Sequence, residues 1–300
     1  MKKLFIAFIA LIVPSFVYAW DQRPNQPMDV CKAFMPYGEI TNIGKQKTTP
    51  LCRQGYFIMH DNDAKIPLWA AWNITPEHVN GCVKRTNAFV ADAALPPNQR
   101  STPSDYAGSG YDQGHIANDA HQSWDQQVEY ESFLMSNMSP QLPGLNRGIW
   151  KLLETSTGAW TFSRKHTLVI YAGNIYTVGK DKTIGNNKVV VPNKLWKIVI
   201  DTQTNEVFAF LFPQAENQGN DLSKVQVTVA DIETATGLSI PLPPGTNKLT
   251  KPALWATDFK SVAENKKART SFVCVSITTF QSLFGTTTLL LPIVLSFPTV

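Results

Sequence analysis

This sequence of 300 residues lacks several features that would by themselves indicate a class of protein. No internal repeat and no long low-complexity linker is visible, so we expect a single domain rather than an array. The four cysteines contain no C-x-x-C pair, which argues against a zinc ribbon. The expected strands do not alternate with helices in a βαβ rhythm. That pattern indicates an α+β fold.

The sequence also lacks a strong charge of either sign. The formal net charge is +4, and losing Lys2 and Lys3 with an N-terminal leader would leave +2. So small a net positive charge does not by itself indicate nucleic-acid binding, although a local basic patch could still attract a phosphate backbone. The candidates for such a patch are Lys45, Lys47, Arg53, Arg85, Arg147 and Lys151. For Lys45 and Lys47, an equally good interpretation is that they are scattered surface charges that keep the protein soluble.

Long apolar runs are confined to the two ends of the chain. Residues 1–19 have a lysine-containing start, an apolar centre and a small-residue cleavage site at Val17-Tyr18-Ala19. We expect a cleavable signal peptide, a mature start at Trp20, and a secreted or periplasmic protein. An uncleaved anchor is the alternative, but the run is short for a membrane span. Residues 271–300 contain no charged residue and form an atypical apolar segment broken by prolines.

The number of cysteines is even, and all of them follow the expected signal peptide. In an exported chain this favours two disulfides, and four cysteines allow three pairings. Free buried thiols are the alternative. The four residues are Cys31, Cys52, Cys82 and Cys274.

Hydrophobic patterning predicts several strands and one helix that matters for the site. The helix is expected over residues 146–155, with an apolar face and a stop at Gly158. The expected strands are residues 55–59, 68–73, 167–172, 188–191, 195–200 and 207–212.

The chemistry is concentrated in three ordered blocks: GSGYDQGH ending at His115, ESFLMSNMSPQ from Glu131 to Gln141, and LNRGIWKLLE ending at Glu154. An imidazole near its ordinary pKa can take a proton from water at neutral pH. The Asn146 amide is a neutral oxygen ligand of the kind that suits Mg²⁺, which needs few protein ligands. Glu154 lies eight residues beyond Asn146, about 80° around a helix, and could hold a metal-bound water.

These blocks resemble the DNA/RNA non-specific endonucleases of the ββα-metal (His-Me finger) superfamily. The family pattern is Asp-Arg-Gly-His, then Ser-Asn-Met-x-Pro-Gln, then an Asn followed by a helix that carries a Glu. The matching positions here are Asp112–His115, Ser136–Gln141, Asn146 and Glu154. The resemblance extends over most of the chain to about residue 265.

The resemblance implies a ββα-metal core with a central, mainly antiparallel sheet flanked by helices. It also implies a Mg²⁺-dependent endonuclease that cleaves DNA and RNA with little sequence preference and leaves 5′-phosphate ends. Mn²⁺ is a possible substitute metal. The resemblance does not indicate whether DNA or RNA is preferred, or what the oligomeric state is.

The resemblance also implies a role for each matching residue. His115 would be the general base, Asn146 the metal ligand, and Glu154 the residue that orders the metal's waters. Arg85 and Arg147 would hold phosphate, and Asn137 would contact substrate or the metal's water shell. For Asn137, a buried structural amide is the alternative.

One position departs from the family pattern. Gln113 stands where the family has arginine, and glutamine has neither the charge nor the bidentate fork of a guanidinium. Gln113 is therefore expected to contact substrate only as a neutral partner. The same departure supports an alternative function, a catalytically weakened nuclease-like module that binds nucleic acid or a protein. Of the remaining histidines, His60, His78 and His166 are expected to be structural or at the surface, whereas His121, six residues after His115, could line the same site. Without a third ligand, we do not expect His115 and His121 to form a metal pair.

Overall fold

The computed structural model describes residues 25–42 and 44–260. Its main element is a seven-stranded sheet in the order β1-β2-β3-β6-β9-β10-β11, in which every neighbouring pair is antiparallel. The strands are β1 (Thr48–Cys52), β2 (Phe57–Asp61), β3 (Ile66–Ile74), β6 (Leu168–Ile175), β9 (Lys194–Asp201), β10 (Val207–Pro213) and β11 (Gln226–Val227).

Two small antiparallel pairs lie outside this sheet. They are β4 (Asp112–His115) with β5 (Met138–Gln141), and β7 (Thr183–Ile184) with β8 (Val189–Val190). The helices are α1 (Met28–Cys31), α2 (Pro103–Tyr106), α3 (Gln126–Ser132), α4 (Lys151–Arg164) and α5 (Val229–Thr236). The strands of the large sheet pair antiparallel and are not joined by a regular βαβ alternation, which confirms the predicted α+β class.

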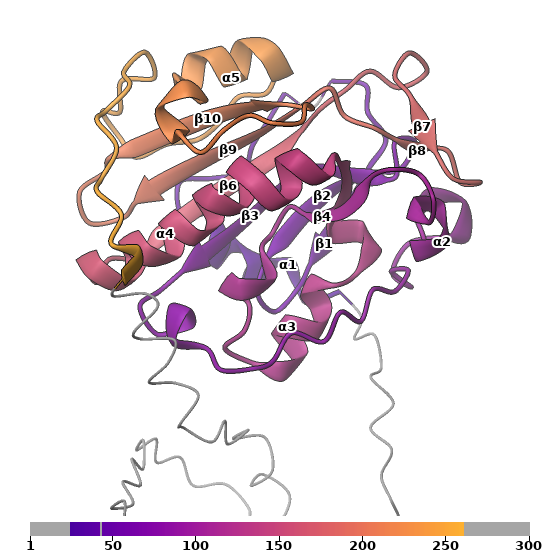
Figure 1. The fold of residues 1–300 in the computed structure, drawn as a ribbon, viewed down its shortest axis with the longest axis horizontal. Helices are drawn as coiled ribbons and strands as arrows, with labels where there is room; N and C mark the ends of the chain where they lie inside the picture. The colour runs from indigo at the N-terminus through magenta and orange to yellow at the C-terminus, as the bar shows by residue number, and fades with distance from the viewer. Residues whose placement is uncertain (1–24, 43, 261–300) are drawn as a thin grey trace, which may run out of the picture.

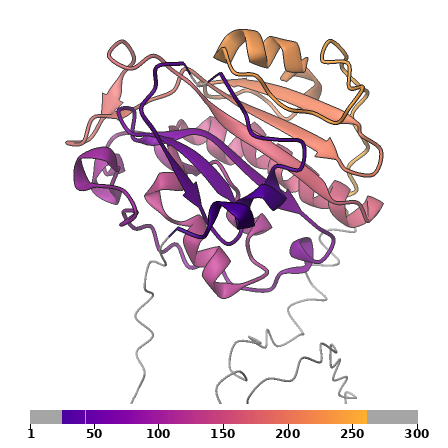
Figure 2. The same ribbon diagram turned by 180° about the vertical axis from the view of Figure 1, so that it is seen from behind.

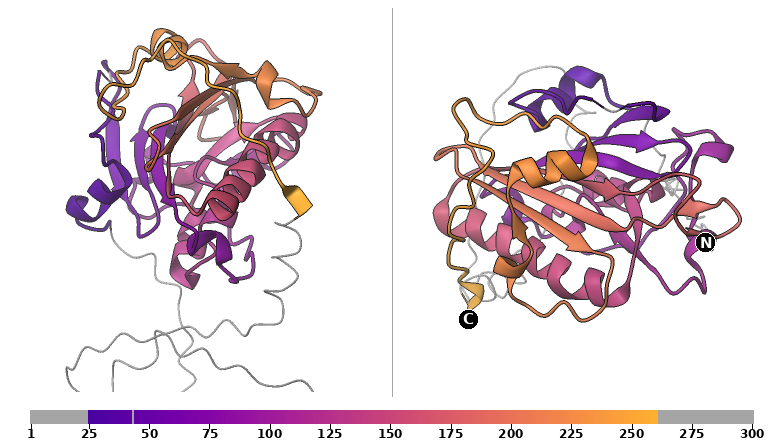
Figure 3. Two further views of the ribbon diagram at one scale, coloured as in Figure 1. Left: turned by 90° about the vertical axis from the view of Figure 1, so that its left-hand side faces the viewer. Right: turned by 90° about the horizontal axis from the view of Figure 1, so that it is seen from above.

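Both faces of the large sheet are buried against other elements (Figures 1 and 2). On one face, α4 and the segment before it pack Trp150, Leu153 and Trp160 onto the sheet. On the other face, α1 and α5 bury Cys31 and Ile232 in a second core. Figure 3 shows the resulting layers from the side and from above. The central strands consequently have runs of buried residues rather than alternating ones.

Burial on both faces explains why the expected strands lie close to the observed ones. Residues 68–73 fall within β3, and residues 195–200 fall within β9. The predicted helix stop at Gly158 is wrong, because α4 continues through it to Arg164 and ends where Lys165 adopts a left-handed conformation (φ 61°). Trp160 and Thr161, both buried, keep this part of the helix against the sheet.

Cys31 and Cys52 form a disulfide that ties α1 to the edge strand β1. This confirms one of the two predicted disulfides. The remaining pair, Cys82 with Cys274, reaches outside the described residues and stays a prediction. The expected signal peptide and the apolar segment 271–300 also lie outside them. Within the described part of the chain, no helix is long and apolar enough to cross a membrane.

Candidate active site

The three sequence blocks come together as one ββα unit. β4 and β5 pair in the register Gly114 with Ser139 and His115 with Met138. A π-helical segment, Leu145–Trp150, then leads into α4 and is interrupted at Gly148 by non-helical torsions (φ −99°, ψ −115°). The indole Nε1 of Trp150 donates a 3.2 Å hydrogen bond to the carbonyl oxygen of His115. This bond ties the helix to the end of β4.

His115 sits in an aromatic pocket at the end of β4. Its residue exposure is 7%, and its ring meets Phe133 edge-on (centroids 4.9 Å apart, 87°) and lies 5.7 Å from Phe89. The pKa of His115 is lowered to about 4, chiefly by burial and to a smaller extent by the Arg85 charge, although Asp119 opposes the shift. The imidazole is therefore neutral at neutral pH, the form that a proton acceptor requires. Its Nε2 is buried without a hydrogen-bond partner among the described residues.

Arg85 lies near His115 and contacts the face of the same Phe133 ring. Its guanidinium is 4.8 Å from the centroid of that ring. Nη1 is 2.5 Å from Oδ2 of Asp119, and Nε donates to Oδ1 of Asn87 at 2.7 Å. Burial alone would raise the pKa of Asp119, but His115 and Arg85 together bring it below its ordinary value. Arg85 is thus held close to the imidazole with 45% of its side chain exposed.

Asn146, the predicted metal ligand, is oriented by Asp112 of β4. Its Nδ2 donates to Oδ2 of Asp112 at 2.9 Å, which leaves the amide oxygen for another partner. Arg147 forms a bidentate pair with the same carboxylate, through Nε (2.8 Å) and Nη2 (2.6 Å). Burial raises the pKa of Asp112, but the bonds from Arg147 and Asn146 outweigh burial and lower it. Asp112 is therefore an ionised anchor for both residues.

Glu154 lies in the first turn of α4 and forms a buried ion pair. Its Oε1 is 3.3 Å from Nζ of Lys197 on β9, and the two side chains are 9% and 1% exposed. The Lys197 ammonium also lies 3.8 Å from the centroid of the Trp150 ring. Burial raises the pKa of Glu154, while Lys197 and a hydrogen bond from Asn118 counteract it. Glu154 is thus a buried residue of the site, held between α4 and β9.

The structure places Asn137 differently from the substrate contact expected for it. The residue is 0% exposed, and its Nδ2 donates to the carbonyl oxygens of Ala117 and Ser132, both at 2.8 Å. Its Oδ1 accepts from the Ala117 N–H at 2.9 Å. All its polar atoms are therefore engaged by the backbone. Asn137 fixes the segment that follows His115 instead of facing substrate, which corresponds to the structural alternative.

Gln113 occupies the same face of β4 as His115, because side chains alternate along a strand. It is half-buried, and its Nε2 lies 3.8 Å from the Met135 sulfur. Gly114, on the opposite face, is required by packing: a Cβ there would lie 2.3 Å from the Gln141 side chain. The sequence Gln-Gly-His is thus fitted closely to β5.

Comparison with known proteins gives the same picture as this geometry. Residues 37–248 match the family model described as DNA/RNA non-specific endonuclease. The chain belongs to that family. It is 33% identical to a nuclease of Nostoc sp. (67% of this chain, 77% of that protein) and 29% identical to human mitochondrial endonuclease G (67% and 72%). It is also 29% identical to a nuclease of Serratia marcescens (72% and 81%).

A solved structure of EndoG in complex with its inhibitor EndoGI has the same fold. The TM-score is 0.62 at 25% identity, covering 73% of this chain and 94% of that one. Family membership confirms the resemblance that the three sequence blocks indicated. As a non-specific endonuclease, the protein is a phosphodiester hydrolase. Members of the family depend on a divalent metal. In the described residues of this endonuclease, no three His, Cys, Asp or Glu side chains cluster as a metal cage.

Three side chains of the endonuclease's cleft were not found by sequence reasoning: Asn118, Asp119 and Lys197. Asn118 and Asp119 directly follow the Gln-Gly-His block, so their nearness to His115 could have indicated them. Lys197 lies 43 residues beyond Glu154 and left no signal except a lysine inside an apolar strand. A buried lysine in such a strand requires a partner, and this requirement is a usable sign.

His121, which the sequence suggested could line the site beside His115, is instead buried in a structural position. Nε1 of Trp72 donates to its Nδ1 (3.3 Å), and its Nε2 lies 3.1 Å from the carbonyl oxygen of Glu154. An acceptor at Nδ1 and a donor at Nε2 define one neutral tautomer. Burial correspondingly lowers the pKa of His121 to about 4. The residue supports the turn of α4 that carries Glu154.

Proposed function

We propose that this protein is a secreted or periplasmic, Mg²⁺-dependent endonuclease that hydrolyses DNA and RNA with little sequence preference. The observation that carries the proposal is the pairing of two groups on one ββα unit. These are a neutral His115 at the end of β4 and an Asn146 whose amide oxygen is left available by Asp112. Mn²⁺ is a possible substitute for Mg²⁺.

The donor set around Asn146 supports magnesium. A single neutral amide oxygen, with no cage of acidic or sulfur ligands in the described cleft, suits a cation that keeps most of its waters. When bound, Mg²⁺ stabilises charge that develops on the phosphate and the leaving 3′-oxygen. Asn146 would hold it directly. Glu154, kept in place by Lys197, would accept hydrogen bonds from its waters.

The remaining chemistry falls to this chain's own side chains. His115 accepts a proton from the attacking water, which its neutral state at pH 7 permits. Arg85, next to the imidazole and partly exposed, contributes positive charge to the phosphate that is attacked. Arg147 keeps Nη1 free of the Asp112 pair and can reach a phosphate at the mouth of the cleft.

A second candidate, the weakened nuclease-like module, draws support from one observation. Gln113 has no charge, and its amide packs against Met135 where a guanidinium would stand in the family pattern. A binding-only module, however, has no use for an oriented Asn146 together with a neutral His115 and an ionised Asp112. The enzyme is therefore the better-supported function.

Degradation of supercoiled plasmid and of ribosomal RNA by the purified mature protein distinguishes the two functions. With millimolar Mg²⁺ we expect both substrates to fall to short fragments, and excess EDTA to stop the reaction until Mg²⁺ is restored. Binding without cleavage under every metal condition supports the module instead. Export is tested by the N-terminus of the protein from the periplasm or medium, which should begin at Trp20.

A further inference from the structure

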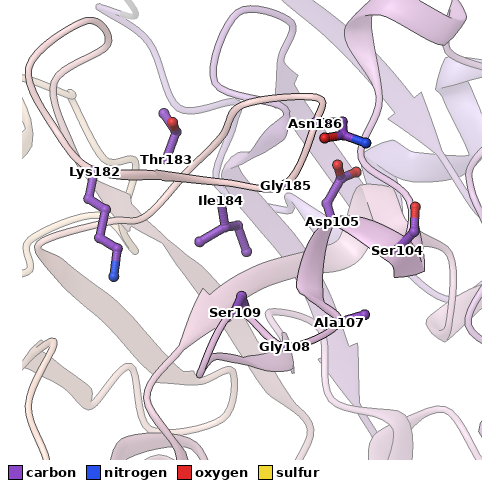
Figure 4. A pocket seen from close by; sticks show the side chains of 10 residues that line it. All are labelled: Ser104, Asp105, Ala107, Gly108, Ser109, Lys182, Thr183, Ile184, Gly185 and Asn186. Atoms are coloured by element: carbon purple, nitrogen blue, oxygen red, sulfur yellow. The ribbon is translucent and has the colours of Figure 1, made fainter.

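A polar hollow lies next to the ββα unit, on a surface that the catalytic residues do not use. Its volume is about 420 Å³, and two chain segments line it: residues 104–109, before β4, and residues 182–186, in the β7–β8 hairpin. Figure 4 shows the two segments facing each other across the hollow, with Lys182 at one end and Ser104 and Asn186 at the other.

The lining of the hollow contains one exposed cation, Lys182, one buried carboxylate, Asp105, and several neutral polar side chains. Lys182 is exposed, and no carboxylate within the described residues pairs with it. Asp105, the acidic residue of the lining, is 2% exposed, and its oxygens are already engaged. Oδ1 accepts from the Asn187 N–H (3.0 Å), and Oδ2 accepts from Asn187 Nδ2 and from the Thr102 N–H (both 2.8 Å). Burial raises the pKa of Asp105, but these bonds outweigh burial and lower it, so the carboxylate keeps its charge while its oxygens are directed at these donors. The group that the hollow offers to an anion for direct contact is therefore the Lys182 ammonium.

The backbone along one side of the hollow is open to close approach. Gly108 and Gly110 have φ of +68° and +83°, and a Cβ at either position would meet nothing within 4 Å. Glycine is favoured where the chain adopts this left-handed conformation, and here it also leaves space above the backbone. A sugar–phosphate chain can therefore lie against this segment without meeting side chains.

The hollow is continuous with the catalytic strand. Lys182 Nζ lies 4.9 Å from the centroid of the Tyr111 ring and 3.5 Å from its hydroxyl, and Tyr111 directly precedes β4. From Tyr111 to His115 is four residues, or about 13 Å of extended strand. Duplex DNA advances 3.4 Å per base pair, so the same distance is about four base steps.

We propose that this hollow is a second phosphate-contacting surface, which binds the nucleic-acid backbone about four base steps from the cleaved bond, with Lys182 as the phosphate ligand. The inference rests on the proposed function and extends it to a flanking site. Because the lining reads charge and backbone shape, the contact is independent of sequence. The hollow would supply a cationic contact, whereas the residue at position 113, Gln113, is uncharged.

The test measures binding without cleavage. A fluorescein-labelled 16-base-pair duplex is titrated with protein in EDTA, and anisotropy is followed from 50 to 200 mM salt. Lys182→Ala should weaken binding about three- to tenfold and make the slope of log affinity against log salt shallower by about 0.9, the value for one phosphate contact. Thr183→Glu, which places a carboxylate in the hollow, should weaken binding at least as much.

The matched control is Lys180→Ala. Lys180 belongs to the same lysine-rich hairpin, two residues away, but does not line the hollow. Its variant should bind like the wild type, and all three variants should melt like the wild type because the altered side chains are exposed. Wild-type binding by Lys182→Ala, or equal losses in Lys180→Ala and Lys182→Ala, overturns the proposal. Failure of the proposed function is distinct, since it appears as a wild-type protein that leaves plasmid intact.

Discussion

The Nδ2 of Asn146 donates to Oδ2 of Asp112 over 2.9 Å, so a strand residue sets the orientation of the amide at the start of the catalytic helix. An amide has one donor end and one acceptor end, and engaging Nδ2 leaves Oδ1 as the end that could bind a cation. Arg147, bonded to the same carboxylate, keeps Asp112 in place. The proposed metal ligand is thus oriented by two side chains that need not touch the metal.

Asp112→Ala should therefore impair metal use although it removes no ligand. We expect the Mg²⁺ concentration for half-maximal plasmid cleavage to rise about 10- to 100-fold, the usual cost of losing a residue that orients a ligand. Asn146→Ala should raise it further, and Arg147→Ala should raise it less than either. A Mg²⁺ titration of the four proteins measures the order. Identical titrations for wild type and Asp112→Ala would contradict the orientation role.

The buried pair of Glu154 and Lys197 gives a prediction that separates stability from activity. Lys197→Met leaves a buried carboxylate without its cation and should lower the free energy of unfolding by about 3–5 kcal/mol. The double variant Lys197→Met/Glu154→Leu should recover most of that stability, since an apolar pair of similar size replaces the ions. It should still require more Mg²⁺ than the wild type.

Urea unfolding and Mg²⁺ titration of the single and double variants test this together. A double variant that regains both stability and ordinary Mg²⁺ dependence would show that Glu154 has only a structural role. Glu154→Gln serves as the control, because it keeps the volume of the side chain while removing its charge and one of its two acceptor oxygens.

Two of the three buried histidines of the described residues, His115 and His121, predict a loss of stability in mild acid. Burial lowers the pKa of His115 and of His121 to about 4, below the value near 6.5 of an unfolded chain. The unfolded chain therefore binds protons first as the pH falls. Each histidine contributes stability that is fully present above pH 6.5 and is lost between pH 6.5 and 4, on the order of 3 kcal/mol.

Urea unfolding of wild type and His115→Asn at pH 7, 6 and 5 measures this effect. Removing one of the two groups should reduce the dependence of unfolding free energy on pH by up to about 1.4 kcal/mol per pH unit within that window. His166→Asn is the control, since His166 lies 2.7 Å from the Asp201 carboxylate and is partly exposed. An unchanged pH dependence in His115→Asn contradicts burial of a neutral His115.

Which residues meet in the site was predictable because the three motif blocks are ordered and each lies on a short element. The expected 80° between Asn146 and Glu154 assumed a regular helix. The observed break at Gly148 separates the two into a π-helical turn and α4, and no periodicity could have shown this. The strands of the large sheet were predictable for a different reason: their apolar runs are long and interrupted by turns.

Residues whose roles depend on distant partners were not predictable from one sequence. Asn137 and Asn146 are the same residue type, and only the fold buries the first against Ala117 and leaves the second facing Asp112. Arg147 was expected to hold phosphate, and its Nε and Nη2 instead donate to Asp112, 35 residues earlier. Lys197 reaches Glu154 across the sheet–helix interface.

The most direct test of the account is single-turnover cleavage of a labelled duplex by His115→Ala at saturating Mg²⁺. Removing the proton acceptor should slow cleavage about 10²- to 10⁴-fold, while duplex affinity in EDTA and urea stability at pH 7 show that the protein is folded and binds. Glutamine at the same position should not restore the rate. Cleavage by folded His115→Ala at the wild-type rate would contradict His115 as the general base.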